Sequence, residues 1–296
     1  MIDSPHKLGW RKNPPGEYPK ARAVLSTRPA RMGVLPPLSK PNLLPFRGTR
    51  IDQLNAAACV AFDLTRRLQL YFAANNLGAN LLASPLDIYW KGRAEEFAGT
   101  DPDERPALLD QGTIPVNALT AIAAEGFALW DDYPYTDDPK RLASEPPASL
   151  FVRSYAQHGM QWGHIDEVGS ARIDRTKGAL LQRCPVGFGI TVDEAFMQNA
   201  GQRITSINEK YLVGGHMLTV LAVLDADLIR ELRDSMPLPA DAQAGDVLFD
   251  NWWTSTQWGL PGYGFGLMSG DLFGSSWVDD VSMLEAVPPV LNRSEP

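Results

Sequence analysis

The stretch DQLNAAACVAF, residues 52–62, leads from a polar turn into a helix, and Cys59 stands at the junction. After Cys59 the apolar residues recur at steps of three and four, with Arg66, Arg67 and Gln69 between them: Val60, Leu64, Leu68 and Tyr71. That period is typical of a helix with one apolar face. We therefore expect a helix that begins at Cys59 and ends near Asn75.

A thiol on the first turn of a helix lies near unpaired backbone N–H groups and the positive end of the helix dipole. Both favour negative charge, so Cys59 is expected to ionise more readily than a thiol in water. Gln53, six residues upstream, can donate its side-chain amide toward the same place. A lone cysteine beside alanines is, however, also typical of a small buried residue packed for its size. The local sequence leaves both interpretations open.

The composition is that of a globular protein, with 44% hydrophobic and 21% charged residues among 296. This length suggests two domains or one two-lobed unit. No run approaches the roughly 18 apolar residues of a membrane span, and the first residues show no apolar core of a secretory signal, although a chain whose leader was removed would look the same. Two cysteines, Cys59 and Cys184, fit a reducing compartment, with a single bridge left open. We expect a cytoplasmic or virion-associated protein.

Residues 1–48 form a basic, proline-rich segment, here called the arm. Residues 1–50 hold ten Lys or Arg, two Asp or Glu and nine of the 24 prolines, whereas the whole chain has a net charge of −8. Proline at this density favours an extended chain. A basic arm can bind nucleic acid, its own acidic body or a neighbouring subunit. We favour protein as its partner, because apolar residues are interleaved with the charges: Leu8, Trp10, Val34, Leu35, Leu43 and Leu44.

Beyond the arm, residues 49–148 are expected to be mainly helical and residues 149–296 mainly strand, giving two packed lobes. Pro85 opens a short expected helix, and another is expected over residues 114–127, with Pro115 near its start and Gly126 at its end. A further helix is expected over residues 174–184. The β-branched and aromatic runs predict strands at residues 151–155, 186–192, 216–224, 246–250 and 263–267. No phosphate loop is present, and no cofactor or metal is expected.

A nucleophilic thiol needs a base and a group that orients the base. Among four histidines, His216 is distinctive because it follows two glycines and opens an apolar strand; a histidine there is also compatible with a core role. Asn251, in the run FDNWW, carries an amide that can accept from the imidazole, and the indole of Trp253 can shield that bond. An aromatic patch at a strand end is the alternative interpretation.

In order and spacing these residues resemble the papain-like cysteine peptidases, most closely the bacterial and phage-type members. In that family a Gln precedes a helix-opening Cys by six residues, a His opens a strand of the second lobe, and an Asn begins an Asn-x-Trp motif followed by Trp-Gly and Gly-Tyr. The resemblance covers roughly residues 41–277 and includes Tyr133-Pro134-Tyr135 and the PVGFGI run from Pro185. It implies an α+β fold of a helical lobe, with a central cysteine-bearing helix, packed on an antiparallel barrel-like lobe.

The resemblance also implies the site: Cys59 as nucleophile, His216 as general base and acid, Asn251 as its orienter, Gln53 and the Cys59 N–H as oxyanion donors, and Trp253 as shield. The sequence departs from the family where Ala56-Ala57-Ala58 precedes the cysteine, at Val60 in place of Trp, at Gly215 and at Trp252 in place of a small residue. It also has no Gly-Gly motif of the substrate-binding wall.

Several functions remain open at this stage. The first is a peptidase that cleaves peptide or protein substrates through an acyl-enzyme, with the arm as a pro-segment across the cleft or as a permanent element. The second, favoured by the basic arm on an acidic body, is a structural or assembly protein, such as a virion component, whose arm binds protein partners. The third keeps the fold and changes the acceptor, as in deamidation, transamidation or hydrolysis of another amide.

Overall fold

The computed structural model of the chain describes residues 7–16, 35–78, 81–101, 108–153, 160–253 and 258–287. Its elements follow one another in this order: η1 (Leu44–Phe46), α1 (Cys59–Ala74), α2 (Pro85–Ala94), η2 (Glu95–Phe97), α3 (Pro115–Glu125), α4 (Pro139–Ala143), α5 (Ala148–Arg153), β1 (Gln161–His164), α6 (Gly169–Leu181), β2 (Val186–Asp193), α7 (Glu194–Met197), β3 (Arg203–Ile204), η4 (Glu209–Tyr211), β4 (Leu212–Val223), α8 (Ala226–Arg233), β5 (Val247–Asp250), β6 (Phe265–Met268), α9 (Gly270–Phe273) and β7 (Val278–Ala286).

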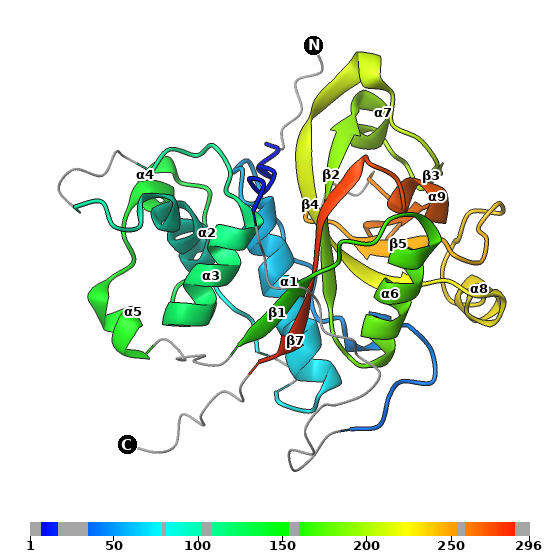
Figure 1. Cartoon of the computed structure of the whole chain (residues 1–296), viewed down its shortest axis with the longest axis horizontal. Helices are drawn as coiled ribbons and strands as arrows, with labels where there is room; N and C mark the ends of the chain where they lie inside the picture. Colours follow the sequence, from blue (N-terminus) through cyan, green and yellow to red (C-terminus); the bar gives the residue numbers. More distant parts are fainter. Residues whose placement is uncertain are drawn as a thin grey trace.

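Helices α2 to α5 lie on one side of the molecule, the sheet lies on the other, and α1 runs between them (Figure 1). Within the described residues the seven strands form one sheet in the order β1-β7-β2-β4-β5-β6-β3. The pair β3–β6 is parallel, whereas the remaining neighbours are antiparallel. Among the described residues, the helices α1 to α5 precede all seven strands in the chain.

Helix α1 is the centre of the packing. It spans Cys59–Ala74, as its apolar spacing predicts, and it contacts α2, α3, β2, β4 and β7. The expectation that one face meets solvent is wrong: Arg66, Arg67 and Gln69, which separate the apolar positions, are also buried. A charged residue is buried only when it is paired. The partners of these arginines join the helix to the sheet.

The first network of such partners surrounds Arg67. Its guanidinium lies 2.7 Å from the carboxylate of Asp63, one turn earlier, and donates to the carbonyl and hydroxyl of Ser282 on β7. Asp63 in turn accepts a 2.7 Å hydrogen bond from the hydroxyl of Thr219 on β4. A Cβ at Gly187 on β2 would lie 2.5 Å from the Asp63 carboxylate, so only glycine leaves room for the pair. Burial raises the pKa of Asp63 to about 6.

The second network surrounds Arg66, whose guanidinium lies 2.8 Å from Asp250 at the end of β5. Arg47 approaches the same carboxylate at 2.9 Å, and Arg66 also donates to the carbonyl of Thr49. Asp250 directly precedes Asn251 in the chain. The cysteine-bearing helix is thus tied to the strand end that carries the predicted orienting amide.

Replacing Arg67 with methionine is expected to lower the free energy of unfolding by about 3–5 kcal/mol, because Asp63 would remain buried without its counter-charge. Equilibrium unfolding in urea measures the loss. The control is Arg230→Met, since Arg230 pairs with Asp227 at the exposed surface and should leave the midpoint unchanged. A loss below about 1 kcal/mol for Arg67→Met would show that the buried pair contributes little to the fold.

Most of the expected elements form close to their predicted bounds. Helix α3 begins at Pro115 and ends before Gly126, which adopts φ 76°, a backbone conformation that glycine tolerates. The expected strands at 186–192, 216–224, 246–250 and 263–267 correspond to β2, β4, β5 and β6. The predicted helix over 174–184 starts earlier, at Gly169.

The strand expected over residues 151–155 is wrong as far as the structure describes it, because residues 151–153 belong to helix α5. The amide of Leu150 donates to the carbonyl of Pro147, a helical turn that starts directly after two prolines. Proline is well suited to the first turn of a helix, and five residues are too few for periodicity to separate strand from helix. Residues 154 and 155 lie outside the described part of the chain.

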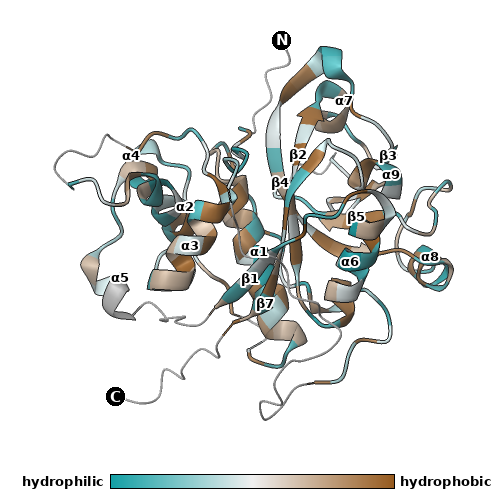
Figure 2. Cartoon of the chain, in the orientation of Figure 1, coloured by the Kyte–Doolittle hydropathy of each residue, from teal (hydrophilic) through white to brown (hydrophobic). Residues whose placement is uncertain are grey.

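Apolar side chains fill the space between α1 and the sheet, and they also pack on the inner strands of the sheet. Hydrophobic residues, coloured brown, gather on β5 (Figure 2). Leu43 of the arm is fully buried, and Leu8, Leu44 and Trp10 pack against the two apolar clusters; Val34 lies outside the described residues. Among the described residues, no helix has the length and apolar character needed to cross a membrane.

Candidate active site

Cys59 is the first residue of α1 and is completely buried. The backbone N–H groups of Met217, Gly9 and Val60 donate to its sulfur and lower its pKa, and Val60 is the one that belongs to the helix start. Burial has the larger effect and raises the pKa of the thiol to about 12. The expected easy ionisation is therefore wrong for this state of the protein. Gly9, one of these backbone groups on the sulfur, belongs to the arm.

His216 and Asn251 meet at the junction of β4 and β5. The two strands pair with Thr219 opposite Asp250, and the imidazole Nε2 lies 2.8 Å from the Asn251 side-chain oxygen. Both residues are buried. The expectation that His216 opens its strand is wrong, because β4 already begins at Leu212. Met217 follows His216 and its N–H reaches the sulfur, so the imidazole is carried by the same part of β4 that touches Cys59.

The two tryptophans after Asn251 hold this pair in place. The ring of Trp253 stacks on the imidazole of His216, with centroids 4.6 Å apart and planes 19° apart. Trp252 donates its indole N–H to the carbonyl of Met217 at 2.9 Å and its backbone N–H to the Asn251 side-chain oxygen at 2.7 Å. Trp252, a departure from the family sequence, thus anchors the loop beside His216 and stays inside the core.

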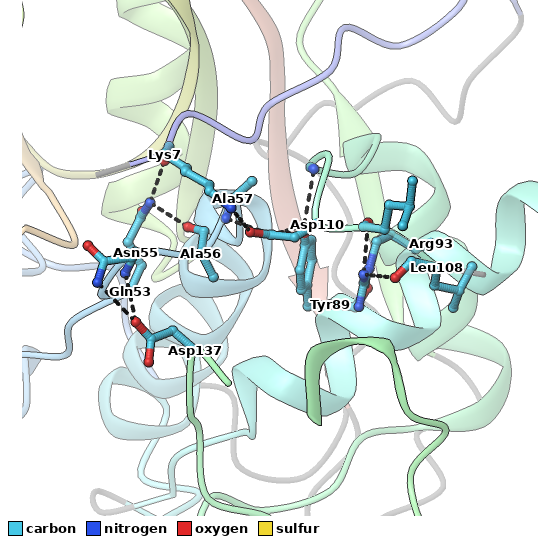
Figure 3. Close-up of polar contacts among 12 residues, drawn as sticks. Lys7, Gln53, Asn55, Ala56, Ala57, Tyr89, Arg93, Leu108, Asp110 and Asp137 are labelled. Atoms are coloured by element: carbon cyan, nitrogen blue, oxygen red, sulfur yellow. Dashed lines mark hydrogen bonds and ion pairs between the residues drawn. The ribbon is translucent and has the colours of Figure 1, made fainter. Parts of the chain in front are cut away.

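Gln53 lies beside the same loop, since its backbone N–H donates to the carbonyl of Trp252 at 3.0 Å. The hydroxyl of Tyr135 donates to the Gln53 carbonyl at 2.7 Å. The side-chain amide of Gln53 donates to the carbonyl of Lys7 at 2.8 Å and to that of Ala56 at 3.1 Å (Figure 3). The amide predicted to stabilise an oxyanion is therefore engaged by a carbonyl oxygen of the arm.

Residues 7–12 of the arm pass between the helices and the sheet with their backbone bonded to both. On the helical side, Thr113 donates to the carbonyl of Gly9 at 3.0 Å and accepts from Arg11 at 3.2 Å. On the sheet side, Trp10 donates to the carbonyl of Gly215 at 3.2 Å. The arm therefore covers the sulfur as an added backbone strand between the two halves of the molecule.

Charged side chains fasten the same segment. Lys7 lies 2.8 Å from Asp110, Arg11 lies 2.8 Å from Glu96, and Lys12 pairs with Asp279. The Lys12 ammonium holds the pKa of Asp279 below its ordinary value, although partial burial acts against it. The basic arm is thus matched by carboxylates of both halves of its own chain.

Asp110 connects the arm to the start of α1. One of its oxygens accepts from the backbone N–H of Ala57 at 2.9 Å and from the hydroxyl of Tyr89 at 2.8 Å, while the other binds Lys7 (Figure 3). The guanidinium of Arg93 lies 3.8 Å from the centre of the Tyr89 ring. One carboxylate therefore binds both the turn before Cys59 and the arm that covers it.

Sequence reasoning missed the groups that bind the arm, above all Thr113 and Asp110. A Cβ at Gly112 would lie 2.1 Å from the Gly9 carbonyl oxygen, and one at Gly9 would lie 1.8 Å from the carbonyl oxygen of Ala57. These two glycines permit the close approach, but a glycine in a sequence does not name the backbone that approaches it. Within the described residues, no group of three His, Cys, Asp or Glu side chains could hold a metal ion.

The structure brings the predicted residues together. The sulfur of Cys59 accepts from the N–H of Met217, the imidazole of His216 is bonded to Asn251, and the backbone of Gln53 is bonded to the loop that follows Asn251. Both cysteines are free, so no bridge joins Cys59 to Cys184. A cysteine at the start of a central helix, packed against the strand that carries a histidine bonded to an asparagine, is the arrangement of the papain-like fold. The chain has this α+β fold.

Comparisons with known proteins agree with this assignment of the fold. No protein-family model matches the chain. In sequence it is 21% identical over 262 residues to an uncharacterized peptidase C1-like protein of Acanthamoeba polyphaga mimivirus, covering 86% of this chain and 75% of that protein. In structure it is similar to xylellain, a cysteine protease from Xylella fastidiosa, with a TM-score of 0.67 and 17% identity over 97% of this chain and 100% of that one.

A procathepsin B from Trypanosoma congolense is also similar, with a TM-score of 0.60 and 12% identity over 95% of this chain and 86% of that one. These likenesses confirm the fold class and the resemblance on which it was predicted. They point to the papain-like cysteine peptidases as the class of enzyme to which the site should be compared. The roles of Cys59, His216, Asn251 and Gln53 stay predictions.

Proposed function

We propose that this protein is a papain-like cysteine peptidase whose own arm covers its nucleophile. The observation that carries the proposal is the fixed His216–Asn251 pair, which is stacked under Trp253 and carried by the part of β4 that touches the sulfur of Cys59. A peptidase needs these three groups in one place, because the thiol needs a base and the base needs a fixed orientation. The mimivirus relative and xylellain support the same reaction class by their names.

In the proposed reaction His216 takes the proton of the Cys59 thiol, and the sulfur forms a bond to the carbonyl carbon of a peptide. Gln53 and the Cys59 N–H donate to the oxyanion. The protonated imidazole then gives its proton to the leaving nitrogen as the C–N bond breaks, and a thioester remains. Water adds to that thioester, His216 takes the water proton and returns it to sulfur, and the carboxylic acid leaves.

The arm is proposed to be a shield, because its contacts occupy the groups that a substrate would need. The carbonyl of Lys7 takes the amide of Gln53, and the N–H of Gly9 points at the sulfur. Attack requires the face of a carbonyl carbon near the nucleophile, whereas the peptide before Gly9 turns its N–H edge to it. A bound arm of this geometry therefore excludes a substrate.

Cleavage of a mixed peptide library by the full chain, with the arm weakened by Trp10→Gly, tests the proposed function. Mass spectrometry of the products should show peptide bonds cut by this chain and left intact when Cys59→Ala is added. Hydrolysis that persists without the sulfur would assign the activity to another group. The contacts given above for residues 7–12 are with the chain itself. The alternative function, in which the arm binds a second protein in an assembly, stays a prediction.

A further inference from the structure

The indole of Trp10 lies in a slot on the sheet that exists because two residues lack side chains. A Cβ at Gly189 on β2 would lie 2.3 Å from the indole ring, and a Cβ at Gly215 on β4 would lie 2.4 Å from it. These distances are far shorter than any real contact, so any larger residue at either position would expel the ring. The two glycines thus form one wall of a flat space of indole size.

Asp280 closes the slot with a carboxylate. Its Oδ2 accepts from the indole N–H of Trp10 at 2.7 Å and from the backbone N–H of Asn13 at 2.9 Å. Asp280 is only 3% exposed, and burial raises its pKa. Its backbone adopts φ 49°, a conformation that costs energy for a residue other than glycine. A buried carboxylate held at such a backbone angle is an acceptor built for a ring N–H donor.

The slot lies beside the proposed reaction centre. Trp10 directly follows Gly9, whose N–H donates to the sulfur of Cys59. The backbone N–H of Trp10 donates to the carbonyl of Gly215, the neighbour of His216. A peptide substrate can reach the sulfur only where the arm now lies. Its chain would then pass the same backbone groups, and one of its side chains near the cleaved bond would enter the slot.

We propose that this slot is the specificity pocket of the enzyme, that it selects tryptophan in a peptide substrate, and that Asp280 is the residue that distinguishes tryptophan from other aromatic side chains. The proposal rests on the proposed function. The glycine wall fits any flat ring, but among phenylalanine, tyrosine and tryptophan only tryptophan carries a ring N–H, which reaches the carboxylate at the end of the slot. A pocket built to bind a hydrogen-bond donor rejects the analogue that lacks it, because its polar group is left unpaired.

The test measures binding without catalysis, in full-length Cys59→Ala/Trp10→Gly protein. Removal of the Trp10 side chain empties the slot and leaves its walls unchanged. N-acetyl-tryptophanamide and N-acetyl-phenylalaninamide are titrated, and binding is followed by protein NMR shifts. We expect the tryptophan amide to bind at least about tenfold more tightly than the phenylalanine amide. Because no reaction is needed, this result does not depend on whether the enzyme cleaves peptides.

Three variants in the same background define what the preference depends on. Asp280→Ala should reduce the tryptophan-to-phenylalanine ratio to near one, whereas Asp280→Asn keeps an acceptor oxygen and should retain most of it. Glu285→Gln, farther along the same strand, is the matched control and should leave the ratio unchanged. Gly189→Val should abolish binding of both amides because it fills the slot.

Binding of neither amide, equal binding of both, or a preference that survives Asp280→Ala would overturn the proposal. In the library digest by the Trp10→Gly chain, cut sites should cluster near tryptophan. Cut sites near lysine or arginine instead would also overturn it, by showing that Asp280 selects cations. A digest without any cleavage would contradict the proposed peptidase function, whereas the amide titration would still decide the specificity of the slot.

Discussion

Cys59→Ala, placed in the full chain that also carries Trp10→Gly, is expected to lower kcat/KM on a fluorogenic peptide by roughly 10⁴-fold or more. The reason is that the proposed reaction forms a covalent bond to sulfur, for which the alanine offers no substitute. His216 and Asn251 are bonded to each other at 2.8 Å and do not need the sulfur to keep their geometry. The variant should therefore retain its fold, which circular dichroism and thermal unfolding verify.

The matched control for this loss is Cys184→Ala, because Cys184 is also free and buried but packs with the other apolar cluster. Cys184→Ala should change kcat/KM by no more than about threefold relative to its parent, because this substitution affects stability and not the chemical step. His216→Ala should fall to the same level as Cys59→Ala, and the double variant should lose little more, since residues that act as a unit are not additive. Equal activity of Cys59→Ala and its parent would exclude this cysteine as the nucleophile.

Trp10→Gly alone is expected to raise the rate at which iodoacetamide alkylates Cys59 at pH 7 by at least about 100-fold. Burial raises the pKa of this thiol to about 12, so very little of it is ionised at that pH, and the thiolate is the reactive form. Loss of the indole removes its contact with Asp280 and its packing against Gly189 and Gly215. The arm should then open more often and admit water and reagent. Mass spectrometry of the Cys59 peptide gives the rate.

Lys40→Gln is the control for a general effect of arm substitutions. Lys40 also belongs to the arm, but it pairs with Glu231 at the surface. The rate at which iodoacetamide alkylates Cys59 in the Lys40→Gln variant should equal the rate in the wild type. A Trp10→Gly rate that matches the wild type would contradict the shielding role of the arm and would leave the sulfur buried for reasons within the core.

The sequence predicted the central helix and named candidate site residues, because their signals are local. The apolar spacing after Cys59, the two glycines before His216 and the Asn251-Trp252-Trp253 run each describe a short piece of chain. The structure brings these pieces together in the order that the resemblance implied. Trp253 stacks on His216 as a shielding ring would.

The state of the thiol was not predictable from local signals. The start of a helix does favour the thiolate, and the N–H groups on the sulfur agree with that expectation. Burial, however, is decided by which distant segment covers the sulfur, and that segment is the arm, some fifty residues upstream. The sequence showed a basic arm and an acidic body but not that Lys7, Arg11 and Lys12 meet carboxylates beside the site. Buried Arg66 and Arg67 were misjudged for the same reason, because their partners come from β5 and β7.

The most direct test of the account is the pH dependence of Cys59 alkylation in the Trp10→Gly chain, with and without His216→Ala. If the exposed thiol is paired with His216, alkylation should already be fast at about pH 6, well below the ordinary thiol pKa of about 8.5, and His216→Ala should remove that reactivity at low pH. A rate that rises only above about pH 8 and is unchanged by His216→Ala would contradict the account.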